Sequence, residues 1–219
     1  MGDLETRWLG RVPYAEALEL QGRTLAARRR GEVGDTLLLL EHPPVVTLGR
    51  RARPGNLRVG ASELAARGIE VHAVSRGGDV TYHGPGQLVG YPIVDLAARG
   101  ECDVGAFLRG LEALLMQAAA ELGVATRRIP GWTGVFVDAP AERPRKLASI
   151  GIGVRGWITC HGFALNVDLD LAGFGAIVPC GLAQVEMTSL ARELGPRAPA
   201  DLALRARRAV AAACARRWS

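Results

Sequence analysis

Aromatic residues and long apolar runs are scarce in this chain, and each scarcity excludes a class of protein. Aromatic residues make up only 5% of the sequence, and no recognition-helix pattern accompanies the basic charge, so we expect no nucleic-acid binding. No stretch approaches the roughly 18 uninterrupted apolar residues that a membrane-spanning helix needs. The polar, acidic start also lacks the basic and then apolar order of a signal peptide. We therefore expect a cytoplasmic protein with no membrane contact.

Cysteine is sparse as well, and its spacing argues against two common roles. The four cysteines, Cys102, Cys160, Cys180 and Cys214, are widely separated and include no CxxC pair. That spacing indicates neither a disulfide scaffold nor a zinc ribbon, so each cysteine is expected to be a free thiol. A metal site built from Cys160 and His161 with distant ligands is the least favoured interpretation, because the ligand spacing is wrong.

Positive charge is carried almost entirely by arginine. Of 27 basic residues Lys146 is the only lysine, and the formal net charge is +5. The arginines gather at residues 28–30, 50–53, 205–208 and 216–217. Such runs are usually solvated faces, but they can also form a surface that attracts an acidic partner. A lone lysine among arginines indicates a position that requires a compact ammonium or an amine able to release its proton.

The chain is long enough for one domain with a sizeable core, since it has 219 residues of which 48% are hydrophobic. We expect residues 1–219 to form a single domain. Apolar periodicity predicts helices at residues 14–30, 61–66, 104–122, 188–194 and 200–217. Short apolar or alternating runs predict strands at residues 36–40, 45–48, 69–74, 88–94 and 132–137. This order favours an α+β fold with mixed β-sheets flanked by helices.

A β-hairpin is predicted from residues 146–154 and 157–167, with Arg155-Gly156 as its two-residue turn and Val154 opposite Trp157. The side chains on one face of this hairpin are all small: Ser149, Gly151, Gly162 and Ala164. Small side chains on a sheet face leave a slot in which a ligand chain can lie close to the backbone. A helix packed on this face would explain the same pattern.

Residues 76–91, RGGDVTYHGPGQLVGY, are dense in glycine and lie between two strand-like runs. Glycines let backbone N–H groups converge on an anion or a carbonyl oxygen, and Arg76 and His83 can add side-chain donors. The segment is not a P-loop, because no GKS or GKT follows, and its glycine spacing differs from a dinucleotide-binding fingerprint. We interpret it as a ligand-binding loop, with a complex turn as the alternative.

Cys180 has the strongest sign of reactivity among the cysteines, because it stands between a proline and a glycine after an apolar run. A tight turn there would present the thiol instead of burying it. A free thiol, with a pKa of about 8.5, is only slightly ionised at neutral pH and needs a neighbour that favours the thiolate. Lys146 is one candidate, as a cation or as a proton acceptor. His83 and His161 are the rival bases, and either would make a Cys-His hydrolase-like site.

Four motifs occur in order along the chain: RGGDVTYHGPGQLVGY at residues 76–91, KLASIG at 146–151, HGFALNV at 161–167 and PCGL at 179–182. As a set they resemble the lipoyl(octanoyl) transferase family of lipoate biosynthesis, and the resemblance spans residues 36–194. The first motif is similar to the family signature through its whole length, and the others follow with similar spacing. The fold implied is that of the catalytic domain of biotin and lipoate ligases.

The resemblance implies an acyltransferase that moves an octanoyl group from acyl carrier protein to a specific lysine of a lipoyl domain. The acceptors it implies are the lipoyl domains of 2-oxoacid dehydrogenase E2 subunits and the glycine cleavage H protein. Cys180 would form the acyl thioester, and Lys146 would lower its pKa or shuttle its proton, with no ATP, metal or other cofactor. The residues implied in substrate contact are Arg76, Gly77, Gly78, Asp79, Val80, Thr81, Tyr82, His83, Ser149, Ile150, Gly151, Gly162, Phe163 and Ala164.

Two other functions stay open from the sequence. An ATP-dependent lipoate or biotin ligase on the same fold would activate a free acid and would need no cysteine nucleophile. A noncatalytic acyl-binding module would hold the chain without turning it over. The predicted hairpin also contains a conflict, because strict alternation puts Lys146 and Ser149 on opposite faces. A bulge near Leu147, or a Lys146 that belongs to the preceding loop, would resolve it.

Overall fold

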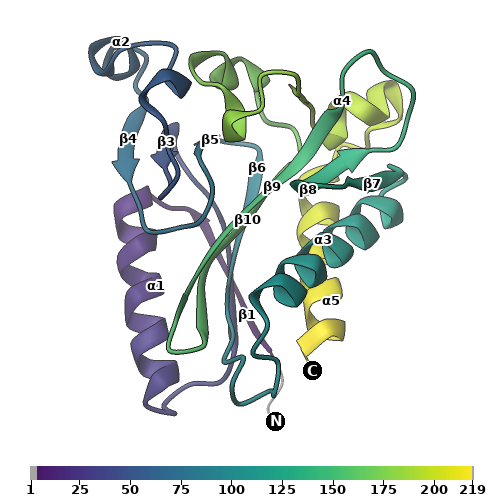
Figure 1. Cartoon of the computed structure of the whole chain (residues 1–219). Coiled ribbons are helices and arrows are strands. Elements are labelled where there is room, and N and C mark those ends of the chain that lie inside the picture. The colour runs from purple at the N-terminus through teal and green to yellow at the C-terminus, as the bar shows by residue number, and fades with distance from the viewer. Residues whose placement is uncertain (1–3, 219) are drawn as a thin grey trace.

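Two mixed β-sheets form the centre of the structure, a computed structural model that describes residues 4–218 (Figure 1). The larger sheet contains, in spatial order, β1 (Glu5–Arg11), β2 (Thr36–Glu41), β6 (Gln87–Ile93), β10 (Ile158–Asn166), β9 (Arg145–Arg155), β8 (Trp132–Val137) and β7 (Thr126–Ile129), and β11 (Glu186–Met187) joins it beside β9. The smaller sheet contains β4 (Glu70–Ala73), β3 (Val45–Leu48) and β5 (Val80–His83). Both sheets hold parallel and antiparallel pairs, which confirms the predicted mixed α+β architecture.

Helices cover both faces of the larger sheet. Helix α1 (Tyr14–Arg29) packs on one face, and α3 (Val104–Glu121) and α5 (Leu202–Trp218) pack on the other, on either side of the long β9–β10 hairpin in Figure 1. The remaining elements are α2 (Ala61–Ala66), α4 (Leu190–Leu194) and the 3-10 turns η1 (Pro54–Asn56), η2 (Leu171–Ala176), η3 (Pro179–Gly181) and η4 (Gly195–Arg197). Among the helices of residues 4–218, none is both long and apolar enough to cross a bilayer.

This cover on both sides explains the leucine run of β2. Leu37 and Leu39 belong to the core cluster under α3 and α5, whereas Leu38 and Leu40 belong to the cluster under α1. Successive side chains of a strand point to opposite faces, so a strand covered on both sides is apolar throughout.

The helices and strands predicted from periodicity are confirmed, with ends that differ by at most a few residues. The sequence does not predict β1, β5, β7 and the two-residue strand β11. Strand β5 lies inside the glycine-rich segment, so the interpretation of that segment as a loop is wrong for residues 80–83. It pairs with β3 from Val80 opposite Leu48 to His83 opposite Val45. Four residues among so many glycines are too few for alternation to be recognised.

The β9–β10 hairpin differs in register from the prediction. Arg155 pairs with Ile158, so the predicted pairing of Val154 with Trp157 is wrong by two residues. The turn is Gly156-Trp157, and both of its residues have a φ of 60°, as the two-residue turn of type I′ requires. A slip of two residues leaves every side chain on its own face. The small residues Ser149, Gly151, Gly162 and Ala164 therefore share one face, as predicted.

The close approach of β10 to β6 leaves no room for a side chain at position 162. A Cβ on Gly162 would overlap the Gly90 carbonyl oxygen and lie 2.7 Å from Pro92 Cδ. We predict that Gly162→Ala lowers the free energy of unfolding by about 1–3 kcal/mol, because two paired backbones must shift. Urea unfolding measures this change.

The matched control is Gly22→Ala in α1, where a Cβ meets nothing within 4 Å. Alanine is a better helix former than glycine, so the free energy of unfolding of this variant should rise by up to about 1 kcal/mol. Unchanged stability of Gly162→Ala would contradict the close approach of the two strands.

Candidate active site

A cavity of about 790 Å³ is lined by both sheets and by the loops between them. Small-molecule sites typically occupy roughly 300–1,000 Å³. The predicted site residues that line it are Arg76, Gly77, Gly78, Asp79, Thr81, His83, Lys146, Ser149, Ile150, Gly151, Gly162, Phe163, Ala164 and Cys180. Segments far apart in the sequence thus meet around one cavity.

Val80 and Tyr82 are expected substrate contacts that the structure does not bring to the cavity. Both are buried in a separate core cluster, where the Tyr82 ring packs against Phe174 of η2. The cause is alternation along β5: Thr81 and His83 line the cavity, so their neighbours point to the opposite face. We therefore leave Val80 and Tyr82 out of the site.

The thiol of Cys180 is presented by a strained turn, η3. Cys180 has a φ of 56° and a ψ of 16°, the left-handed region that costs a residue with a side chain about 1–2 kcal/mol. Gly181, with a φ of 69°, ends the turn. A Cβ on Gly181 would lie 2.9 Å from Asp79 Oδ2, so the turn packs directly on that carboxylate. Such strain gathers at functional sites, where surrounding contacts maintain it.

The carboxylate of Asp79 holds three segments together beneath this turn. It accepts hydrogen bonds from Asn56 Nδ2 at 2.6 Å, from the Val80 N–H at 2.7 Å and from the Arg53 N–H at 3.3 Å. The loop around η1, the start of β5 and the cysteine turn are therefore fixed relative to one another.

A β-bulge resolves the conflict between Lys146 and Ser149. One step along β8, from Val135 to Phe136, corresponds to two steps along β9. Leu147 is the extra residue, so the predicted bulge near Leu147 is confirmed. The alternation of β9 is interrupted there, and both Lys146 and Ser149 can reach the same cavity.

The contact between Lys146 and Cys180 dominates the electrostatics of the site. Lys146 Nζ lies 3.3 Å from Cys180 Sγ and Ser149 Oγ lies 3.8 Å from it. Burial disfavours the thiolate. The Lys146 charge and hydrogen bonds from Lys146 and Ser149, with a smaller contribution from the charge of Arg76, outweigh burial, so the pKa of this thiol falls below its ordinary value. The sulfur is thus prepared to act as a nucleophile.

Arg76 places a second buried cation at the cavity wall. Its guanidinium donates to the Thr47 carbonyl oxygen at 2.7 Å, to Thr47 Oγ1 at 2.9 and 3.1 Å, and to the Gly77 carbonyl oxygen at 3.0 Å. These acceptors are neutral, and burial lowers the pKa of the Arg76 guanidinium. Its charge is therefore not cancelled by these partners and favours negative charge in the cavity.

The rival bases His83 and His161 are held by other partners. His83 Nδ1 lies 2.7 Å from Gln87 Oε1, and burial lowers the pKa of His83 to about 3. His161 Nε2 lies 3.2 Å from Ser75 Oγ, and burial lowers the pKa of His161 to about 4. Within residues 4–218, neither histidine is a hydrogen-bond partner of Cys180. The geometry therefore does not assemble a Cys-His site.

The other cysteines lie apart from this pair. Cys160 is buried in β10 and Cys214 in α5, whereas Cys102 is exposed. In the part of the chain that the structure describes, no group of three or more His, Cys, Asp or Glu side chains is arranged to hold a metal ion.

Several cavity residues give no signal in the sequence. Tyr14 reaches the cavity from the start of α1, Val104 and Leu108 reach it from α3, and Trp132 reaches it from β8. With Phe163 they provide apolar surface that suits a hydrocarbon chain. Periodicity identifies the buried face of a helix but cannot tell whether protein or a cavity covers it.

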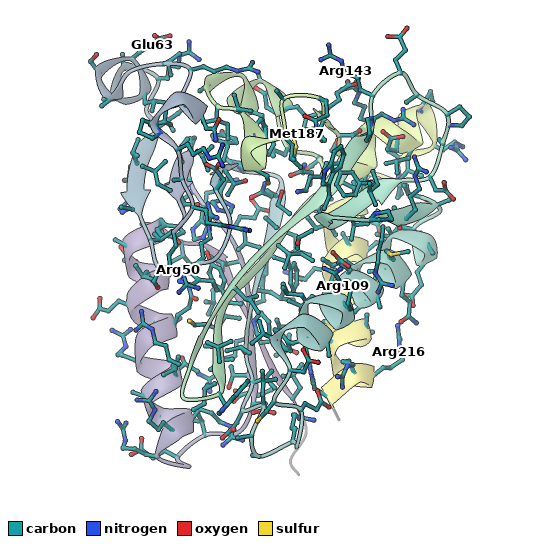
Figure 2. The ribbon with its side chains drawn as sticks, in the orientation of Figure 1. Arg50, Glu63, Arg109, Arg143, Met187 and Arg216 are labelled. Atoms are coloured by element: carbon teal, nitrogen blue, oxygen red, sulfur yellow. The ribbon has the colours of Figure 1, made fainter. Side chains whose placement is uncertain are left out.

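Three arginines, Arg50, Arg51 and Arg53, also line the cavity, and all are exposed. Arg50, labelled in Figure 2, lies on the loop that follows β3. Within residues 4–218, none of the three forms an ion pair with a carboxylate. In the part of the chain that the structure describes, the cavity therefore has three exposed arginines at its wall whose guanidinium groups form no ion pair.

Comparison with known proteins is consistent with this geometry. Residues 13–209 match the family model of the lipoyl protein ligase A/B catalytic domain. An octanoyltransferase from Chloroflexus aurantiacus is 49% identical over 201 residues, which cover 91% of this chain and 88% of the relative.

Solved structures confirm the expected fold at low sequence identity. A bipartite lipoate protein ligase from Thermoplasma acidophilum is 17% identical, with a TM-score of 0.70 over 96% of this chain and 82% of that one. A biotin protein ligase from Leishmania major is 10% identical, with a TM-score of 0.58 over 98% of this chain and 76% of that one. The family model spans most of the sequence and a relative shares nearly half of its residues, so the chain belongs to the lipoyl protein ligase A/B catalytic-domain family, among its octanoyltransferases.

Proposed function

We propose that this octanoyltransferase carries the octanoyl group as a thioester on Cys180, between acyl carrier protein and a lysine of a lipoyl domain. Residues 1–219 would act as one catalytic domain in the cytoplasm. The proposed acceptors are the lipoyl domains of 2-oxoacid dehydrogenase E2 subunits and the glycine cleavage H protein. The observation that carries the proposal is the 3.3 Å contact between Lys146 Nζ and Cys180 Sγ at the wall of an open cavity. An ammonium beside a thiol favours the nucleophilic thiolate.

In the first half-reaction the Cys180 thiolate attacks the carbonyl carbon of the octanoyl thioester. The bond from that carbon to the carrier's sulfur breaks, and the carrier's thiol leaves with a proton from the Lys146 ammonium. Backbone N–H groups of the glycine-rich segment stabilise the oxyanion that forms in between. One thioester replaces another, so this step is close to balanced.

In the second half-reaction the neutral amine of the acceptor lysine attacks the acyl-enzyme. An amide bond forms, the bond from Cys180 Sγ to the acyl carbon breaks, and Lys146 takes the proton that the amine loses. The thiolate and the ammonium are thereby restored together. Amide formation drives this step.

The acyl chain would lie along the small-residue face of the β9–β10 hairpin. Gly151 and Gly162 are paired there, and Ser149 pairs with Ala164. The missing side chains let a hydrocarbon approach the backbone, and the apolar residues of α3 and β8 complete the wall.

The acidic acyl carrier protein would dock at the mouth of the cavity. Arg50, Arg51 and Arg53 are exposed beside the opening. A cluster of unneutralised positive charge raises the rate of encounter with an acidic protein.

The thioester is tested by incubating the protein with octanoyl carrier protein in the absence of ATP. We predict one octanoyl adduct on Cys180, measured by intact mass and peptide mapping. Cys180→Ala should lose the adduct, and Cys102→Ala, which removes an exposed cysteine elsewhere, should keep it. No adduct on the unchanged protein would favour an ATP-dependent ligase, and binding of the acyl group without turnover would favour an acyl-binding module.

The proton shuttle is tested by Lys146→Arg, which keeps the charge but does not readily release a proton. We predict that kcat/KM for octanoyl transfer falls about 100-fold or more, the usual contribution of general acid-base catalysis. Arg145→Lys is the matched control, because it changes the neighbouring basic residue, which pairs with Glu193 at 3.2 Å. Near-normal turnover of Lys146→Arg would leave the lysine an electrostatic role only.

The docking surface is tested by the salt dependence of carrier binding. Affinity for octanoyl carrier protein should fall as salt rises, because exposed charges are screened. Arg51→Glu should weaken binding about threefold to tenfold at low salt, mainly through the association rate. Arg208→Glu on α5, an equal change in net charge at another exposed arginine, should have little effect. An affinity that stays constant from low to high salt would contradict electrostatic docking.

A further inference from the structure

A buried carboxylate on α3 stands behind the reactive pair. Glu112 is 0% exposed. Its Oε2 forms ion pairs with Arg109 Nε at 2.9 Å and Arg128 Nε at 3.0 Å, and its Oε1 accepts the Gly134 N–H at 3.0 Å. Arg109, labelled in Figure 2, is on the same helix. A buried carboxylate stays charged only when it is paired with opposite charge or accepts hydrogen bonds; here Oε2 is held by the ion pairs alone and Oε1 accepts the hydrogen bond.

The peptide that Glu112 holds is also the peptide that holds Lys146. The Thr133 carbonyl oxygen belongs to the same peptide unit as the Gly134 N–H, and it accepts Lys146 Nζ at 2.9 Å. A peptide unit is planar, so fixing the direction of its N–H also fixes the direction of its C=O. Glu112 therefore determines where the acceptor of the ammonium points.

Gly134 allows the lysine tip to lie directly against this peptide. It has a φ of 129°, and a Cβ there would lie 2.6 Å from Lys146 Cε and 2.6 Å from the Ala148 carbonyl oxygen. The ammonium is thus confined between the Thr133 carbonyl oxygen and Cys180 Sγ, which is 3.3 Å away.

We propose that Glu112 is a positioning residue for the transfer reaction, which sets the place of the Lys146 ammonium by holding the Thr133–Gly134 peptide. The inference rests on the proposed function, in which Lys146 acts on Cys180. A purely structural role for Glu112, joining α3 to Arg128 of β7, is the competing explanation. It would change stability and leave the reactivity of the thiol as it is.

The sign of the effect separates positioning from a direct charge effect. Removing a negative charge near the site would by itself favour the thiolate. Loss of the peptide's orientation would move the ammonium away from the sulfur and disfavour the thiolate. Glu112→Asp is the decisive variant, because it keeps the charge and withdraws the oxygen from the Gly134 N–H by one methylene.

The experiment measures the rate of iodoacetamide alkylation of Cys180 against pH, in a Cys102→Ser background that removes the exposed cysteine. We expect Cys180 to be alkylated about tenfold more slowly in Glu112→Asp than in the parent, at pH values below the midpoint of the parent's rate–pH curve. The midpoint of the Glu112→Asp curve should lie at higher pH. Glu112→Ala is the second variant and should shift in the same direction. Circular dichroism verifies that the titrated protein is folded.

Two controls isolate the peptide contact. Arg109→Ala removes an ion-pair partner of Glu112 and leaves the Gly134 contact, and Leu115→Ala removes buried volume from the same helix. In both controls Cys180 should be alkylated at the parent's rate at each pH. A Glu112→Asp profile that matches the parent, or equal shifts in Leu115→Ala, would overturn the inference. The octanoyl adduct on the unchanged protein is a separate readout. If the adduct forms but the Glu112→Asp profile is not shifted, the proposed function stands and only the positioning role of Glu112 is refuted.

Discussion

The site depends on a buried ammonium that lies 3.3 Å from a cysteine sulfur. Either charge alone would be unfavourable in the interior, because a buried ion must be paired or lose its charge. Together the two groups neutralise each other, and the pair can stay ionised in a cavity that a substrate enters. Lys146 is the only lysine in a chain with 27 basic residues. An arginine would present a broad planar fork and could not readily release its proton, so the proposed reaction would account for the exception.

Several local irregularities create this contact, and none of them is regular secondary structure. The bulge at Leu147 turns Lys146 into the cavity, and the left-handed backbone of Cys180 turns the thiol toward it. The Thr133–Gly134 peptide then receives the ammonium. Two of these irregularities are supported by a carboxylate: Asp79, which is partly buried, packs against the cysteine turn, and Glu112, which is fully buried, holds the Thr133–Gly134 peptide. Strained backbone thus occurs at the residues on which the proposed reaction depends.

Much of the fold and part of the site geometry could be predicted from the sequence, because they follow from short-range patterns. The strand periodicity indicated the small face of the hairpin. The bulge near Leu147 was one of two solutions to the conflict that strict alternation puts Lys146 and Ser149 on opposite faces. The register could not be predicted, because it depends on a Gly156-Trp157 turn whose second residue gives no turn signal. Strand β5 was missed because its four residues stand among glycines and are too few for alternation to be recognised. The contact of Glu112 with Gly134 was missed because it joins two segments that are distant in the sequence.

The most direct measurement is the pKa of Cys180 itself, taken as the difference between the thiolate absorbance titrations of the unchanged protein and Cys180→Ser. The account predicts a midpoint below the value of about 8.5 for a free thiol, because the Lys146 ammonium favours the thiolate. Lys146→Met, which replaces the lysine with an unbranched side chain that lacks the ammonium, should move the midpoint upward. A midpoint at or above the free-thiol value in the unchanged protein would contradict the account.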